Sequence, residues 1–326
     1  MGKSSTAVNH WMRDRGRFAD LFNGVVFDGE QVVCPEDLEE ARGESDILVP
    51  DQDKSERQVQ RYRDIVMQWK KGPYLALLAC ESQSGVHYAM PVRNMLYDSL
   101  SYTEQIRRIS ESNRRKEGVE KMSGEEFLSG LRKEDRICPV ITLVLYYGEK
   151  EWDGSRDLYG MFPGGQEDQM RKMLKNYVSD YRINLVDVGK IHEPEKFTSD
   201  LQLIFGMLKY RGDMRELQKY MDRHREYFQN VDADTYRAAR EMLHAGGVME
   251  SMREGKDRKE GTVNMCKALE DLYQSGVDSG MEMGIQALVE TCRELGQTRE
   301  VTEKKVGEKF TVSREKVREC MEKYWA

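Results

Sequence analysis

The chain has 326 residues, of which 39% are hydrophobic and 33% are charged, so it can bury a substantial core beneath a well-charged surface. Its formal net charge of −7 excludes an overall basic, histone-like nucleic-acid binder, but not a local basic groove. The chain has no run near the roughly 20 apolar residues of a membrane helix, no apolar signal stretch at the N-terminus and no CxxC pair. We therefore expect a cytoplasmic protein with reduced thiols and no membrane partner.

The first expected element is an amphipathic helix in "RFADLFNGVVF", residues 17–27. Its apolar side chains recur at helical spacing and are Phe18, Leu21, Phe22 and Val25. The stretch that follows, residues 34–57, is acidic and rich in turn-forming residues, so we predict a loop there.

A β-hairpin is expected next. "YRDIVMQW", residues 62–69, is rich in β-forming residues, and "YLALLAC", residues 74–80, is an apolar run typical of a buried strand. Between them "KKGP" predicts a turn, because Gly72-Pro73 continues neither strand easily.

Helix and strand patterns then alternate up to His192. Residues 90–108 have helical periodicity with Pro91 near the start, where proline is tolerated. "CPVITLVLYYG", residues 138–148, predicts a strand at the centre of a sheet covered on both faces, and residues 182–189 predict another strand. We therefore expect an α/β core.

After His192 the pattern is helical and charged to the end of the chain. Gly276, Gly280 and Gly284 recur every fourth residue and so share one helix face, which favours self-association as a homo-oligomer through the C-terminal helices. Two short helices are expected on either side of a turn near Thr311. They allow a helix-turn-helix, but show no clear recognition-helix pattern, so we favour packing or dimerisation.

The chemistry of the core is concentrated where the hairpin ends. In an extended strand Glu81 and Gln83 point one way and Ser82 the other, and the partner strand brings Asp64 nearby. Two carboxylates converging there would make a hard-oxygen pocket suited to Mg²⁺ or Mn²⁺. The alternative is that the strand ends in polar residues because it emerges into solvent.

The ordered segments "RFADLFNGVVF", "YRDIVMQW", "YLALLACESQ", "MPVRNMLYDSLSY" and "CPVITLVLYYG" resemble the Rpn family of recombination-promoting nucleases and transposase-like proteins. The tail segments "EGTVNMCKALEDL" and "GIQALVETCRELG" also resemble this family. The family belongs to the PD-(D/E)XK nuclease superfamily, so the resemblance implies a restriction-endonuclease-like mixed sheet flanked by helices, followed by an all-helical C-terminal region. We therefore divide the chain into a nuclease core over residues 1–192, a helical extension over 193–255 and a helical tail over 256–326.

By position, the resemblance implies that Asp64 and Glu81 bind the metal, with the Ser82 carbonyl as a third ligand. Gln83 stands where the superfamily has a lysine that activates the attacking water. A glutamine can hydrogen-bond water but brings no positive charge. The resemblance implies that glutamine is common at this position in the Rpn pattern, so a slow enzyme or a different metal arrangement is an alternative to the lysine chemistry.

Further residues are candidates for the functional site, and each of them could instead have a purely structural role. The first helix of the superfamily often adds an acid, for which Asp20 and Asp14 are available, but either is equally a capping or solvent-facing acid. Arg93 and Tyr97 share a helix face and could both face the scissile phosphate. The alternative is that Arg93 is a surface ion-pair partner and Tyr97 is a core residue. The basic run in residues 107–116 either follows a DNA backbone or is a solvated helix end.

Three hypotheses follow. The first is a metal-dependent DNA endonuclease that hydrolyses phosphodiester bonds in recombination or mobile-element activity. The second is a catalytically weakened DNA-binding or assembly protein on the same fold, favoured by Gln83 and the acidic net charge. The third is a helical interaction scaffold, favoured by the tail.

Overall fold

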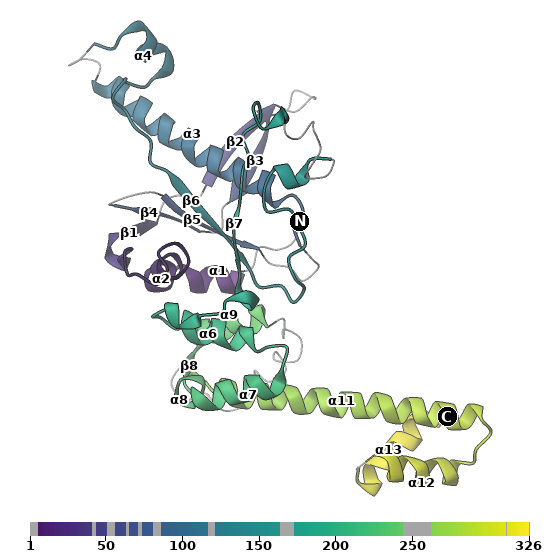
Figure 1. Cartoon of the computed structure of the whole chain (residues 1–326). Helices are drawn as coiled ribbons and strands as arrows, with labels where there is room; N and C mark the ends of the chain where they lie inside the picture. Colours follow the sequence, from purple (N-terminus) through teal and green to yellow (C-terminus); the bar gives the residue numbers. More distant parts are fainter. Residues whose placement is uncertain are drawn as a thin grey trace. The chain divides into compact units, whose positions relative to one another are not determined.

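The computed structural model describes residues 6–40, 44–50, 56–62, 65–70, 74–80, 86–116, 121–163, 173–243, 262–310 and 312–325. The chain forms two compact units, which are treated separately below. The first contains residues 1–224 and 233–244, and the second contains residues 225–232 and 245–326. The mixed α/β class and the helical C-terminal region are as predicted (Figure 1).

A five-stranded mixed sheet is the centre of the first unit. Its strands, in spatial order, are β1 (Leu38–Glu40), β4 (Ile65–Trp69), β5 (Tyr74–Cys80), β6 (Val140–Tyr146) and β7 (Asn184–Asp187). The first three pair antiparallel, whereas β6 runs parallel to both β5 and β7. The predicted hairpin is thus confirmed as β4–β5, and the predicted central strand has a neighbour on each side.

The loop predicted over residues 34–57 is wrong for much of its length. Besides β1 it holds β2 (Glu44–Pro50), which pairs antiparallel with β3 (Glu56–Tyr62), with Ile47 opposite Val59. The acidic composition suggested a loop, but a strand ladder is formed by backbone N–H and C=O groups, which charged side chains do not remove. The short β-forming run Ile47–Val49 was the signal for a strand.

Helices cover both faces of the sheet. Figure 1 shows α3 (Met90–Lys116) on one side and α1 (Thr6–Met12) with α2 (Arg15–Val26) on the other. The predicted first helix corresponds to α2, which buries Phe18, Leu21 and Phe22 but leaves Val25 partly exposed. Helix α3 continues eight residues past the predicted end at Arg108.

The remaining elements of the first unit are helical. They are α4 (Gly124–Ser129), α6 (Leu201–Lys209), α7 (Met214–Arg223), α9 (Ala233–Met242) and the 3₁₀ turns η1 (Pro35–Asp37), η2 (Tyr159–Met161), η3 (Val188–Lys190) and η4 (Pro194–Lys196). Helix α9 packs on α1, where the Trp11 indole donates to Thr235 Oγ1 over 2.8 Å. The partly buried Arg17 side chain on α2 pairs with Asp200 at 2.9 Å, directly before α6.

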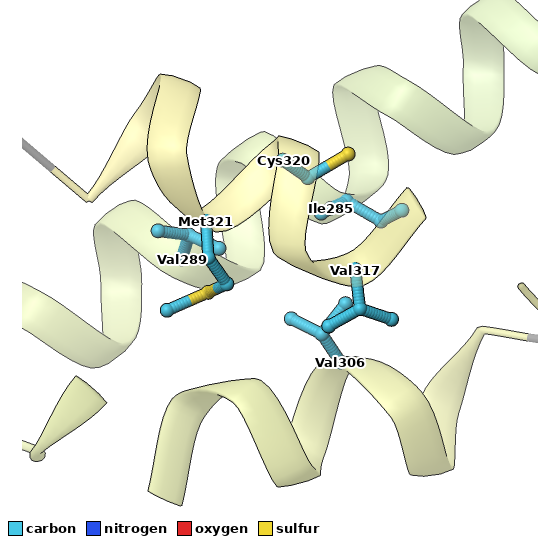
Figure 2. Packing of buried hydrophobic residues seen from close by; sticks show 6 residues of the cluster. All are labelled: Ile285, Val289, Val306, Val317, Cys320 and Met321. Atoms are coloured by element: carbon cyan, nitrogen blue, oxygen red, sulfur yellow. The ribbon is translucent and has the colours of Figure 1, made fainter. Parts of the chain in front are cut away.

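The second unit is built on one long helix. Its elements are α8 (Arg225–Phe228), β8 (Val231–Asp232), β9 (Thr262–Val263), α11 (Met265–Glu294), α12 (Arg299–Lys309) and α13 (Arg314–Tyr324). The last two are the predicted pair of short helices, N-capped by Thr298 and Ser313. Figure 2 shows them closing on α11 around a buried cluster of Ile285, Val289, Val306, Val317, Cys320 and Met321.

The glycine stripe of α11 divides into two parts. A Cβ at Gly284 would lie 3.0 Å from the Phe310 ring, so this glycine permits close packing inside the unit. A Cβ at Gly276 or Gly280 would meet no described atom within 4 Å. Only the end of the predicted face is therefore used within the described part of the chain.

Candidate functional site

The candidate site lies where β4 begins and β5 ends. The two strands are antiparallel neighbours with Ile65 opposite Leu77, and β5 continues to Cys80. The start of β4 and the end of β5 are therefore at the same end of the sheet. Asp64 directly precedes β4 and Glu81, Ser82 and Gln83 directly follow β5 in the sequence, but all four lie outside the described residues.

A buried apolar cluster lies at this end of the sheet. Tyr146, the last residue of β6, is in register with Cys80, and its ring meets Trp152 edge to face with centroids 5.1 Å apart. Met90, the first residue of α3, belongs to the same cluster. The start of α3 is thereby held near the carboxyl ends of β5 and β6.

Glycine at position 148 is required by this packing. A Cβ there would approach Tyr146 Oη to 2.4 Å, and this hydroxyl donates to the Lys150 carbonyl. A larger residue would therefore push the Tyr146 ring out of its place in the cluster.

Asp20 has a structural role. Its side chain is 3% exposed, and its carboxylate accepts hydrogen bonds from the backbone N–H and the hydroxyl of both Thr198 and Ser199. These contacts connect α2 to the segment before α6. Asp14 caps α2, accepting from Arg17 N at 3.0 Å. Asp20 thus makes tertiary hydrogen bonds and Asp14 caps a helix.

Arg93 and Tyr97 lie on one face of α3, as their spacing predicts. The Arg93 guanidinium carbon is 5.7 Å from the centroid of the Tyr97 ring, a cation–π distance. The tyrosine is 7% exposed, whereas Arg93 is half-buried. Burial, and next the charge of Arg93, lower the pKa of His87 just before the helix. Arg93 therefore brings positive charge to the first turn of α3.

A buried polar cluster joins α3 to the sheet and was not predicted. Asp98 Oδ1 accepts from Thr142 Oγ1 at 2.6 Å, and Asp98 Oδ2 accepts from the Tyr181 hydroxyl. That hydroxyl in turn accepts from Asn94 Nδ2 at 2.6 Å. The available signals were two polar residues four apart on α3, Asn94 and Asp98, and a threonine within an apolar strand.

A second unpredicted feature is an arginine at the carboxyl ends of the parallel strands. Arg211 Nη1 donates to the Tyr147 carbonyl over 2.6 Å, and Nη2 donates to the Gly148 carbonyl. Burial lowers the pKa of Arg211, and burial also raises the pKa of Asp187 at the end of β7. The arginine thus connects the α6–α7 turn to the end of β6.

The described side chains form no group of three or more His, Cys, Asp or Glu that could hold a metal ion. None of the helices in the described ranges is long and apolar enough to cross a membrane.

Comparison with known proteins gives a family match over part of the chain. Residues 125–238 match the model of the family described as "Putative transposase, YhgA-like". This segment runs from α4 into α9 and includes Thr142, Tyr181 and Arg211, but it does not reach Asp64 or Glu81. The match confirms the resemblance to transposase-like proteins. No curated protein and no solved structure matches the chain.

Proposed function

We propose that the protein is a metal-dependent DNA endonuclease, which hydrolyses phosphodiester bonds in recombination or mobile-element activity. The observation that carries the proposal is the pairing of β4 with β5 as antiparallel neighbours. Asp64 stands one residue before β4 and Glu81 one residue after β5, so adjacent strands lead to both carboxylates at one end of the sheet. A mixed sheet covered by helices on both faces also supports a restriction-endonuclease-like fold.

The donor set fits a hard divalent cation. Asp64, Glu81 and the Ser82 carbonyl offer only oxygen ligands, which Mg²⁺ and Mn²⁺ prefer. A cation held there would supply Lewis-acid polarisation of a phosphoryl oxygen and a bound water with a lowered pKa. Asp20 is not included in this set, because Thr198 and Ser199 already donate to both of its oxygens.

Two further side chains have roles in the proposal. Gln83 orients the attacking water by hydrogen bonding, without the positive charge of a lysine. Arg93, near the start of α3, supplies a positive charge that binds the scissile phosphate. The Tyr97 ring stabilises its guanidinium through a cation–π contact. Helix α3 begins at Met90, which packs against Tyr146 beside the end of β5.

Nicking of supercoiled plasmid by the purified chain, with Mg²⁺ or Mn²⁺, tests the proposal. Asp64→Ala and Glu81→Ala abolish nicking, whereas Glu36→Ala, which removes an exposed acid from η1, leaves it unchanged. Gln83→Lys retains or raises the rate, because it restores a cation beside the water. Equal nicking by wild type and Asp64→Ala would show that the site is wrong.

A second candidate is assembly without catalysis, on the same fold. It is favoured by the open backbone at Gly276 and Gly280 of α11, beside the exposed side chains of Tyr273 and Val277. These four residues share a helix face, so a second copy would bury them and form a homo-oligomer through the C-terminal helices. DNA binding without cleavage in either metal, together with a solution mass that falls on Gly280→Glu, would favour this reading.

A further inference from the structure

Helix α3 and the segment that follows it form an arm. Figure 1 shows α3 extending past the sheet with α4 at its far end. The returning chain is fastened along the helix: Gln105 exchanges hydrogen bonds with the backbone of Cys138, at 2.7 and 3.0 Å, and Val140 N donates to the Tyr102 hydroxyl at 3.1 Å. We call residues 105–138, as far as they are described, the arm.

The tip of the arm is structurally defined. The buried Asn113 amide donates to the Gly130 carbonyl at 3.2 Å and to Asp135 Oδ2 at 2.6 Å. Gly130 ends α4 with φ +74°, and a Cβ there would lie 2.3 Å from Ser110 Oγ, so only glycine fits. A capping box between Ser123 and Glu126 begins α4. These contacts hold α4 against the last turns of α3.

The four arginines that α3 contributes to the arm fall into two pairs with different surroundings. Arg107 and Arg108 bind Glu104, and Arg107 also binds Glu111. Arg114 and Arg115, two turns further on, are exposed and form no ion pair or hydrogen bond with any described residue. The second pair therefore holds positive charge available to an external anion.

The tip also exposes two large apolar side chains. Phe127 and Leu128 on α4 are 67% and 89% exposed, although such residues are usually found inside. Lys121 and Lys133, on either side of α4, are exposed as well. The Glu126 carboxylate accepts hydrogen bonds from the backbone N–H of Ser123 and of Lys133. Proteins that bind and bend DNA from the minor groove frequently combine basic side chains with exposed apolar ones that insert between base steps.

We propose that the arm is a second DNA contact, separate from the cleavage site, in which Arg114 and Arg115 bind backbone phosphates and Phe127 and Leu128 contact the groove. Charge favours duplex DNA over a second copy of this chain. Residues 107–136 carry nine basic and seven acidic side chains, whereas the whole chain has 51 basic and 58 acidic. A negatively charged partner therefore suits the tip better than the acidic surface of another copy.

The arm sets a spacing along the DNA. From Met90 to Lys116, at a rise of 1.5 Å per residue, α3 is roughly 39 Å long. If a duplex lies along α3, at about 3.4 Å per base pair, the arm would contact it about 11 base pairs away from the candidate site at the end of β5.

Binding of the full chain to a 30-base-pair duplex, in EDTA and over a series of salt concentrations, tests the arm without requiring cleavage. Arg114→Ala/Arg115→Ala weakens binding about tenfold or more at 0.1 M salt and lowers the salt slope by about 2, since each phosphate contact contributes about 0.9. The matched control Arg107→Ala/Arg108→Ala removes the same charge from the same helix but changes affinity less than about threefold, because those arginines are already paired.

A second variant separates apolar contact from charge. Phe127→Ser/Leu128→Ser weakens binding with an unchanged salt slope, and reduces the fluorescence increase of 2-aminopurine placed about 11 base pairs from one end. Equal losses for the two arginine pairs would overturn the proposal, as would unchanged binding by all variants. A changed solution mass with unchanged DNA affinity would assign the tip to a second copy instead. Because cleavage is not measured, these results stand apart from the outcome of the nicking assay.

Discussion

Replacing Thr142 with valine tests the buried polar cluster between α3 and the sheet. Thr142 is 2% exposed, and its hydroxyl donates to Asp98 Oδ1 over 2.6 Å. Valine has nearly the same shape, so the substitution removes this hydrogen bond with little change in packing. A hydrogen bond to a charged group contributes about 1.5–3 kcal/mol, and the carboxylate left behind is buried, so we expect the upper half of that range.

Urea unfolding followed by circular dichroism measures this loss. A loss of about 2.3–3 kcal/mol corresponds to a fall in Tm of roughly 5–12 °C for a unit of this size. Thr103→Val, on the exposed face of the same α3 helix, is the control, and its effect should stay within about 0.5 kcal/mol.

A double-mutant cycle refines the test. Tyr181→Phe removes a second donor to Asp98, so the two effects should be coupled by about 0.5–3 kcal/mol. A Thr142→Val loss below 0.5 kcal/mol, or simple additivity with Tyr181→Phe, would refute the reasoning that one buried carboxylate serves both donors.

Two further predictions concern the helical parts. Val306→Ala leaves a cavity in the buried cluster of Figure 2 and lowers the unfolding free energy of the second unit by about 2 kcal/mol. The control Val301→Ala, at an exposed position on the same helix, changes the unfolding free energy little. Equal effects of the two substitutions would contradict the burial of Val306 in this cluster. Burial raises the pKa of Tyr220 from 10.0 to about 12, so its neutral phenol contributes stability that is complete below pH 10 and is lost as pH rises through about 12. The difference in unfolding free energy between wild type and Tyr220→Phe should therefore decrease over this window, and a constant difference would refute the assignment.

Local patterns were sufficient for much of the fold. The apolar runs that became β5 and β6 and the periodicity of α3 were readable from the residues themselves, because side-chain period reflects which faces are buried. The β2–β3 hairpin was missed because its pairing is a backbone property of two segments, and composition pointed to a loop.

The candidate site was predicted less completely. Spacing and the family resemblance indicated Asp64 and Glu81, and both stay a prediction outside the described residues. The role of Asp20 was not readable, since its partners Thr198 and Ser199 are 178 and 179 positions away in the sequence. Arg211 was missed for the same reason, because its carbonyl partners belong to another element.

By itself the sequence determined an α/β core, a helical tail and a resemblance to transposase-like proteins, which the match over residues 125–238 confirms. Tertiary structure decided which of two similar residues makes contacts within the fold and which stays exposed. It paired Arg107 and left Arg114 exposed, and it packed Gly284 against Phe310 while Gly276 stayed open. The reason is physical: period and composition are properties of neighbouring residues, whereas burial and pairing depend on segments that meet only in the folded chain.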